Sequence, residues 1–262
     1  MEKERNILYF ESIDSTNVQA GREAANGAES GTLVVADSQT AGRGRRGRTW
    51  ESPAGRNLYF SLLLRPELAV EKASMLTLVM ALAVVRALEK QTEADLSESL
   101  AQSKSPQIKW PNDIVLNGKK VCGILTEMSV LPNRIEHVII GVGINVYQQE
   151  FAPGLADKAT SLEAEWGQKL SRERLLGAVM DAFEEYYDLF LQMGDLKMLQ
   201  NIYNHKLVNL NREVRVLDPK GEFTGIATGI NERGELCVKL PDGQIAEVYA
   251  GEVSVRGIPG YV

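Results

Sequence analysis

Residues 108–128 read Ile-Lys-Trp-Pro-Asn-Asp-Ile-Val-Leu-Asn-Gly-Lys-Lys-Val-Cys-Gly-Ile-Leu-Thr-Glu-Met, and this stretch decides the class of fold. Asn117-Gly118 is the strongest short signal for a two-residue hairpin turn, and Pro132-Asn133 turns the chain again a few residues later. The strands expected around these turns are Ile114–Leu116, Lys120–Met128 and His137–Asn145. Consecutive strands joined by tight turns predict an antiparallel sheet rather than the alternating pattern of a doubly wound fold.

Further elements are expected on both sides of this meander. Upstream we expect strands at 6–10, 33–36 and 57–64, a short helix at Thr16–Ala25 and a buried helix at Lys72–Lys90, followed by a polar stretch over 91–106. Ile108–Trp110 is expected to be extended, because Pro111 disfavours the helical conformation of the residue before it. Downstream, Ser171 precedes a long amphipathic helix that ends at Gly194, and a second short helix is expected at Asp195–Asn204.

From Leu207 onwards the sequence pattern becomes rich in short strands. Five short β-rich runs follow one another between turn signals, at Val214–Leu217, Phe223–Ile230, Leu236–Leu240, Ala246–Tyr249 and Val253–Arg256. Such a series predicts a small β-barrel. We therefore expect an α+β protein with two domains, one over residues 1–206 and one over residues 207–262.

Composition narrows the functional classes. The chain has 262 residues and a formal net charge of −6, which does not favour a protein whose main partner is duplex DNA. Its two cysteines and two histidines are isolated, so neither a disulfide framework nor a histidine metal site is expected. The N-terminus does not resemble a signal peptide, and the uncharged run Ala73–Val85 is too short to span a bilayer. We expect a soluble protein of the cytoplasm.

The densest chemical signal is the loop Ala41-Gly-Arg-Gly-Arg-Arg-Gly-Arg-Thr-Trp50. Its glycines formally match the dinucleotide-binding pattern, but that pattern needs a helix immediately afterwards, and here Pro53, Gly55 and a strand follow. Flexible backbone and concentrated guanidinium groups are suited to binding carboxylate or phosphate. The loop by itself leaves three interpretations open: a site for an anionic small ligand, a basic tether for nucleic acid, or a solvated basic loop.

Several stretches together resemble the biotin protein ligase family. The loop Gly42–Arg48 with Trp50 resembles the biotin-binding loop of that family, and the other matching stretches occur in the family's order. They are Ser12-Ile-Asp-Ser-Thr-Asn17, Lys109-Trp-Pro-Asn-Asp113, Lys119–Glu127, Gly141-Val-Gly-Ile-Asn145 and the tail Gly251–Gly257. The Arg/Gly loop and Lys-Trp-Pro-Asn-Asp are the specific motifs, and the resemblance spans nearly the whole chain.

The resemblance implies a fold, an activity and a set of site residues. The fold is a central mixed or antiparallel sheet with helices, similar to class II aminoacyl-tRNA synthetases, plus a small SH3-like barrel. The activity is ATP-dependent formation of biotinyl-5′-AMP and transfer of biotin to a lysine of a carrier protein. Residues implied at biotin are Ser15, Thr16, Asn17, Gln39, Gly42, Arg43, Gly44, Arg45, Lys120 and Gly123. Residues implied at ATP are Arg43, Arg45, Arg48, Trp50, Lys109, Asn112 and Asn145.

The implied mechanism rests on charge. A carboxylate must attack the α-phosphate of ATP, and Arg43, Arg45 and Lys120 can neutralise the repulsion between the two anions. A charge-assisted hydrogen bond contributes roughly 1.5–3 kcal/mol, so the loss of one should cost about ten- to a hundredfold in rate. Asp113 is the candidate that orients or deprotonates the carrier lysine. Mg²⁺ is expected on the phosphates, with ligands that the sequence does not identify.

Local structural explanations compete with several of these roles. Thr16 and Gln19 form a capping-box pattern, which favours helix capping over ligand contact for Thr16. Asp113 after Pro111-Asn112 also suits a turn. Strand alternation places Lys120 and Gly123 on opposite faces, so a bulge or twist would have to bring them together.

Lysines and glycines on the expected strands also have structural explanations. Lys109, Lys119 and Lys120 could be ordinary edge-strand lysines that guard against aggregation. Gly141 and Gly143 could mark only a bulge or close packing.

Three other functions remain as rivals. A lipoate or octanoate ligase of the same superfamily would carry a histidine near the glycine-rich stretch, and none lies near this loop. A non-enzymatic biotin sensor with an N-terminal DNA-binding domain is disfavoured because the ligase pattern begins by residue 12. The third rival is an RNA-binding module. The resemblance further implies a carrier from acetyl-CoA or pyruvate carboxylase and a homodimer, and we expect no direct DNA binding.

Overall fold

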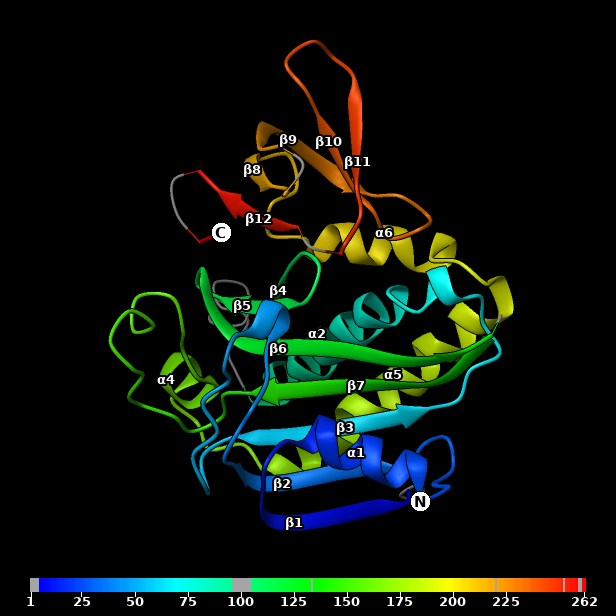
Figure 1. Ribbon diagram of the computed structural model, residues 1–262. Coiled ribbons are helices and arrows are strands. Elements are labelled where there is room, and N and C mark those ends of the chain that lie inside the picture. Colours follow the sequence, from blue (N-terminus) through cyan, green and yellow to red (C-terminus); the bar gives the residue numbers. More distant parts are fainter. Residues whose placement is uncertain (1–4, 96–104, 133, 220, 252, 259–260) are drawn as a thin grey trace.

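The computed structural model describes residues 5–95, 105–132, 134–219, 221–251, 253–258 and 261–262. These residues form a seven-stranded sheet with helices packed on it and a separate five-stranded sheet from the last part of the chain (Figure 1). The mixed α/β architecture agrees with the expected class.

The large sheet has the strand order β1-β2-β3-β7-β6-β5-β4. Its strands are β1 (Ile7–Ile13), β2 (Leu33–Gln39), β3 (Leu58–Leu64), β4 (Gln107–Lys109), β5 (Asp113–Leu116), β6 (Lys119–Leu131) and β7 (Arg134–Ile144). β1 and β2 are parallel, and every other neighbouring pair is antiparallel. The expected meander of residues 108–145 is confirmed and forms four of the seven strands, β4 to β7.

The hairpin between β5 and β6 turns where the sequence indicates. Asn117 has φ of 48° and Gly118 has φ of 74°, the left-handed pair that a two-residue hairpin turn requires. Glycine and asparagine adopt this conformation at the least steric cost. The turn therefore fixes the register that places Lys120 on β6.

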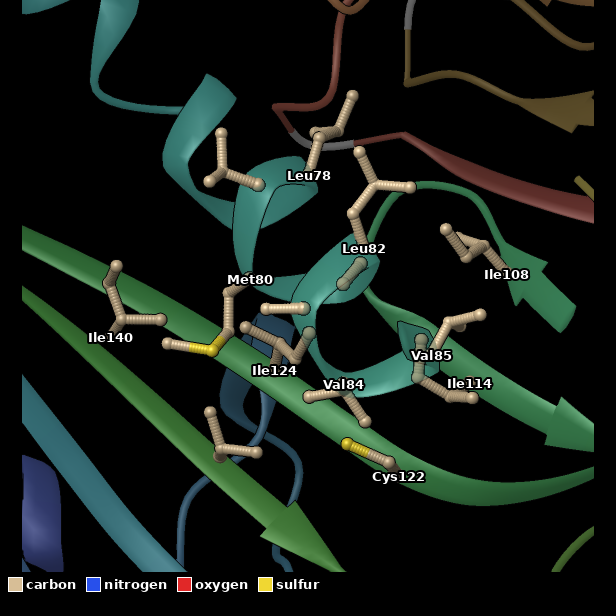
Figure 2. Close-up of a cluster of buried hydrophobic side chains, with 14 of the residues drawn as sticks. Leu78, Met80, Leu82, Val84, Val85, Ile108, Ile114, Cys122, Ile124 and Ile140 are labelled. Carbon is tan, nitrogen blue, oxygen red and sulfur yellow. The ribbon is translucent and has the colours of Figure 1, made fainter. Parts of the chain in front are cut away.

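The apolar helix α2 (Met75–Asp95) is the centre of the core. Figure 2 shows Met80 of this helix close to Ile124 of the sheet, and Val84 close to Cys122. The uncharged run of the sequence is thus a buried helix, as expected. Residues 91–95 of the expected polar stretch complete α2, and residues 96–104 lie outside the described part of the chain.

Helices cover both faces of the large sheet (Figure 1). α1 (Thr16–Ala25) packs on β2, β3 and β7, while α5 (Arg172–Met193) packs against α2 on the other face. The Ser171 hydroxyl accepts from Arg174 N and Gly194 ends α5 in the left-handed conformation, so both expected ends are confirmed. α6 (Lys197–Lys206) follows, and a short helix α4 (Leu162–Trp166) was not expected.

The five expected C-terminal strands are present. They are β8 (Glu213–Leu217), β9 (Phe223–Ile230), β10 (Leu236–Lys239), β11 (Ile245–Val248) and β12 (Ser254–Gly257). Their order is β11-β10-β9-β8-β12, and all neighbours are antiparallel. In Figure 1 this sheet lies above α6 and beyond the β4–β5 end of the large sheet. Within the described residues, no helix combines the length and the apolar character that crossing a membrane demands.

Candidate active site

The Arg/Gly loop forms a small hairpin over the large sheet. Gly44 N donates to Arg48 O at 2.7 Å, and Trp50 N donates to Gly42 O at 2.9 Å. Gly42 permits this closure, because a Cβ there would lie 2.3 Å from the carbonyl oxygen of Trp50. The chain then continues into β3 without the helix of a dinucleotide site. Side chains from the loop therefore face two cavities beside it.

The smaller cavity lies between the loop and the floor of the sheet, and its volume is about 40 Å³. Its lining includes nine of the residues implied at biotin, namely Ser15, Thr16, Asn17, Gln39, Arg43, Gly44, Arg45, Lys120 and Gly123. Gly42 does not line it and instead closes the loop, as described above. Elements β2, α1 and β6 thus bring together residues that are more than 100 positions apart.

Polar side chains on this floor are linked in a continuous network. Ser61 Oγ donates to Asn17 Oδ1 at 2.6 Å and lies 2.8 Å from Thr16 Oγ1. Gln39 Oε1 accepts from Thr16 N at 2.8 Å, and Gln39 Nε2 donates to Ser52 Oγ at 2.8 Å. The network fixes the orientation of the Gln39 and Asn17 amides.

The capping role favoured for Thr16 is wrong. Thr16 is the first residue of α1, and its backbone N–H is satisfied by the Gln39 side chain rather than by a neighbour on the helix. Gln19 turns along the helix and donates to Glu23 at 2.7 Å. The capping-box pattern is present in the sequence, but a residue from β2 supplies the cap, which releases Thr16 to line the cavity.

Glu127 joins the loop to the network, and sequence reasoning missed it although it ends a quoted motif. Its Oε1 lies 3.1 Å from Arg43 Nη2, and its Oε2 accepts from Asn17 Nδ2 at 2.8 Å. Gly141 leaves room for this arrangement, because a Cβ there would lie 2.0 Å from Asn17 Oδ1. One carboxylate thus orients both an arginine of the loop and an amide of the floor.

Trp50 lies across the sheet between the two cavities. A Cβ at Gly143 would lie 2.5 Å from Trp50 Nε1, and one at Gly123 would lie 2.8 Å from Trp50 Cζ3. Gly143 is therefore a position of close packing, which is one of the alternatives given above for it. The group that packs on Gly143 and on Gly123 is the indole of Trp50. Among the described residues the buried Nε1 has no hydrogen-bond partner.

Lys120 and Gly123 lie on the same face because β6 carries a bulge. Val115 pairs with Lys120 and Ile114 pairs with Cys122, so Val121 is an extra residue in the strand. The bulge shifts the alternation by one residue. As a result, a Cβ at Gly123 would lie 3.0 Å from Lys120 Nζ.

Lys120 forms an ion pair with Asp113 at the junction of the cavities. The Nζ–Oδ1 distance is 2.5 Å, and the ammonium lies 5.1 Å from the centre of a Trp50 ring. Burial opposes the ionisation of Asp113, but the charges of Lys120 and Lys109 outweigh burial and lower the pKa of the carboxyl. Asp113 is therefore an anion in this site rather than a turn-forming residue alone.

Lys109 is buried, although β4 is an edge strand. Only 5% of the residue is exposed, so it is not the solvent-exposed edge lysine that one alternative proposed. Burial lowers the pKa of Lys109 to about 8, while the nearby Asp113 carboxylate opposes this shift. The edge-strand explanation also fails for Lys120, because β6 is an inner strand of the sheet and the ammonium is paired within the site.

The larger cavity has a volume of about 750 Å³ and lies between the two sheets. Six of the residues implied at ATP line it, namely Arg45, Arg48, Trp50, Lys109, Asn112 and Asn145. Arg43 does not, because it faces the smaller cavity. Val253 and Arg256 close the larger cavity from the C-terminal sheet, although neither is among the residues implied at ATP.

Arg45 ties the loop to the C-terminal part of the chain. Its Nη1 donates to Asn112 Oδ1 at 2.9 Å, and its Nη2 donates to the carbonyl oxygens of Ala250 and Gly251, each at 2.7 Å. Gly44, Arg45, Trp50, Asn112 and Lys120 line both cavities, so the cavities meet at these residues. Such a site suits two anionic molecules that react at their point of contact.

Metal ligands are not indicated by the side chains. The described residues contain no group of three or more His, Cys, Asp and Glu that could hold an ion. Asp113, Glu51 and Asp157 are the carboxylates among the described residues that line the larger cavity, and Asp113 is already paired with Lys120. Any Mg²⁺ would have to be held largely by the phosphates of a nucleotide and by water.

Comparisons with known proteins agree with this geometry. The model of the biotin/lipoate A/B protein ligase family matches residues 9–145, and that of the biotin protein ligase C-terminal domain matches residues 210–256. The chain is 38% identical over 255 residues to the bifunctional ligase/repressor BirA of Bacillus subtilis, which covers 96% of this chain and 74% of that protein.

Two further matches cover nearly all of the proteins compared. The chain is 33% identical over 245 residues to the biotin–[acetyl-CoA-carboxylase] ligase of Paracoccus denitrificans, with 91% of this chain and 98% of that protein covered. A structure of biotin protein ligase from Aquifex aeolicus in complex with biotin and ATP superposes with a TM-score of 0.81 at 34% identity, covering 96% of this chain and 99% of that one. The chain belongs to the biotin protein ligase family.

Proposed function

We propose that this protein activates biotin with ATP to form biotinyl-5′-AMP and transfers biotin to a lysine of a biotin carboxyl carrier protein. The observation that carries the proposal is the meeting of the two cavities at Arg45 and Lys120. A carboxylate from one side and a phosphate from the other would come together at these two cations.

The smaller cavity is assigned to biotin and the larger one to ATP. The polar network of Thr16, Asn17 and Gln39 offers donors and acceptors of fixed orientation to the ureido group of biotin. The volume of about 40 Å³ is close to that of a single water molecule. The loop therefore has to move outward to admit biotin.

The first half-reaction needs charge neutralisation rather than a protein nucleophile. The biotin carboxylate oxygen attacks the α-phosphorus, the bond to the β-phosphate bridging oxygen breaks, and pyrophosphate leaves. Arg45 and Lys120, which line both cavities, are assigned to stabilise the negative charge that builds up on the phosphoryl group, and Arg43, which faces the smaller cavity, is assigned to the biotin carboxylate. Bound Mg²⁺ would supply further positive charge to the phosphates.

The second half-reaction transfers the acyl group to an amine. The carrier lysine nitrogen attacks the carbonyl carbon of the mixed anhydride, the carbon–oxygen bond to AMP breaks, and AMP leaves. Asp113 is assigned to orient this amine or to accept its proton. Its lowered pKa keeps the carboxyl ionised and favours the orienting role, because it also makes the carboxylate a weaker base. Closure of the loop would protect the anhydride from water.

Several finer features belong to the same proposal. We assign the large sheet to a class II aminoacyl-tRNA synthetase-like domain and the small sheet to an SH3-like barrel, with a boundary near residue 206, where α6 ends. The expected carrier is a subunit of acetyl-CoA or pyruvate carboxylase, in keeping with the printed name of the Paracoccus relative. A cytoplasmic location, a homodimer and no direct DNA binding complete the proposal. The unpaired thiols of Cys122 and Cys237 suit a reducing compartment.

The test is pyrophosphate release with ATP and Mg²⁺, in parallel with biotin, lipoate, octanoate and no acid. We expect release with biotin alone, and a loss of about tenfold or more in Arg45→Ala and in Lys120→Ala, because each variant removes a charge-assisted contact. Lys197→Ala, an exposed lysine of α6, is the control and should retain the wild-type rate. Release with lipoate or octanoate but not with biotin, from folded protein, would contradict the proposal.

A further inference from the structure

Tyr261 brings a side chain from the C-terminal part of the chain into the charged cluster of the site. Its hydroxyl donates to Asp113 Oδ2 at 2.5 Å, while Lys120 Nζ lies 2.5 Å from Asp113 Oδ1. The two oxygens of one carboxylate are thus divided between a lysine of β6 and a tyrosine that follows β12. None of the motifs that carry the family resemblance includes this tyrosine.

The ring of Tyr261 also contacts the other cations of the cluster. Lys109 Nζ lies 4.2 Å from the ring centre, and Arg256 Cζ lies 5.3 Å from it. An aromatic face attracts cations at these distances, and the attraction is strongest where water is excluded. Tyr261 therefore offsets part of the cost of burying Lys109 beside Lys120.

Charge and geometry leave Asp113 little freedom in this arrangement. It is 9% exposed, and its carboxylate is held from one side by Lys120 and from the other by a hydroxyl. A carboxylate with both oxygens engaged has a fixed plane, and it fixes its partner ammonium in turn. Without the hydroxyl, the carboxyl could rotate and Lys120 would lose its defined position at the junction of the cavities.

We propose that Tyr261 is a positioning residue for the ligase reaction, acting through Asp113 to hold Lys120 where the two cavities meet. This inference rests on the proposed function. It makes the active site composite, since a residue outside the large sheet completes the arrangement around Lys120. The ring of Tyr261 lines the larger cavity, whereas its hydroxyl reaches Lys120 only through Asp113. Removal of the hydroxyl alone should therefore change the rate of chemistry more than the binding of either substrate.

The direct test compares Tyr261→Phe with the wild type in biotin-dependent pyrophosphate release over a range of pH. The substitution keeps the ring and its cation contacts and removes the hydroxyl. We expect kcat to fall about tenfold, as for the loss of a hydrogen bond to a charged group, with the KM values for biotin and ATP unchanged. The acid limb of the pH profile should move to higher pH, because the Tyr261 hydroxyl is one of the groups that lower the pKa of Asp113.

Two further proteins make the outcome specific. Tyr9→Phe, at a tyrosine that is 63% exposed on β1, controls for the loss of a phenol hydroxyl and should behave as wild type. In an Asp113→Asn background, Tyr261→Phe should have no additional effect on the residual rate, because the two residues act as one unit.

The outcomes separate the two proposals. If the wild type is active and Tyr261→Phe is equally active or faster, the positioning role alone is overturned. A faster rate would mean that Tyr261 covers the site and is displaced by substrate. An equal fall with and without Asp113 would also overturn it. A folded wild type that releases no pyrophosphate with biotin would overturn the proposed function and this inference with it.

Discussion

Lys120 is the side chain on which most of the surrounding structure converges. The Asn117-Gly118 turn sets its strand, the bulge at Val121 sets its face, and Asp113 pairs with its ammonium at 2.5 Å. A flexible lysine loses considerable rotamer entropy when it is held in one position. Because folding already holds Lys120 in place, this entropy is not lost again when the substrates bind.

At the same scale, Glu127 should control the affinity for biotin. Glu127→Ala removes one acceptor of Asn17 Nδ2 and the partner of Arg43, so Arg43 loses its fixed orientation and Asn17 is held only by Ser61 and Leu125. We expect the KM for biotin to rise about tenfold while the KM for ATP stays unchanged. Steady-state kinetics with each substrate varied in turn provides the measurement.

The matched control is Glu11→Ala, at an exposed glutamate of β1 that lines neither cavity. Its kinetics should equal those of the wild type. An unchanged KM for biotin in Glu127→Ala would mean that the Arg43 and Asn17 contacts do not organise the biotin cavity.

The buried Lys109 should make stability depend on alkaline pH. Its folded pKa is about 8 and its ordinary value is 10.5, so between these values the folded state has released a proton that the unfolded chain still binds. The contribution of Lys109 to the free energy of unfolding therefore becomes more favourable as pH rises through that window. At 1.36 kcal/mol per pKa unit, the upper bound of this change is about 3 kcal/mol.

Denaturant unfolding of the wild type and Lys109→Met, measured across that window, isolates the effect. The free energy of unfolding of the wild type minus that of Lys109→Met should increase as pH rises. The same difference for Lys197→Met, at an exposed lysine, should show no such trend. A constant difference between wild type and Lys109→Met would show that burial does not lower the pKa of Lys109.

At the scale of elements, the glycines of β7 allow the loop to lie against the sheet. Gly143→Ala would place a Cβ 2.5 Å from Trp50 Nε1, so the indole would have to leave its place. We expect biotin-dependent activity to fall about tenfold or more, as for other displacements of binding groups. The assay is pyrophosphate release at saturating ATP.

Gly177→Ala in α5 is the matched substitution, because nothing lies within 4 Å of the added Cβ. It should leave activity unchanged and raise the free energy of unfolding by about 0.5–1 kcal/mol, the difference between glycine and alanine inside a helix. Equal losses of activity in both variants would contradict a specific role for the contact between Trp50 and Gly143.

The sequence predicted elements better than it predicted side-chain partners. Periodicity and turn residues are local signals, and they predicted the meander, both ends of α5 and all five C-terminal strands. The cap of α1 by Gln39 and the position of Trp50 on Gly143 depend on contacts between distant segments, which local patterns do not encode. The family resemblance grouped the residues of the two cavities. The contacts of Glu127 and Tyr261 are visible only in the three-dimensional structure.

At the scale of the whole molecule, the two sheets meet at the site rather than away from it. Arg45 of the loop donates to the carbonyl oxygens of Ala250 and Gly251, and Tyr261 donates to Asp113 of β5. Val253 and Arg256 complete the wall of the larger cavity. A ligand in that cavity would therefore contact both sheets and stabilise their arrangement.

Ligand-linked stability should reflect this arrangement. ATP at about a hundred times its Kd should stabilise the wild type by about 2.7 kcal/mol, which corresponds to a rise of roughly 5–10 °C in Tm. The rise should be much smaller in Arg45→Ala, while Arg212→Ala, at an exposed arginine before β8, should keep it. Thermal unfolding with and without ATP measures both, and an undiminished rise in Arg45→Ala would contradict the assigned nucleotide contact.

The measurement that tests the central claim most directly is mass spectrometry of a biotin carboxyl carrier domain after incubation with this protein, ATP, Mg²⁺ and biotin. We predict the addition of one biotinyl group to one lysine, dependent on ATP and reduced about tenfold or more when Lys120→Ala replaces the wild type. A carrier that remains unmodified in the presence of folded wild-type protein, or that is modified equally well by Lys120→Ala, would contradict the account.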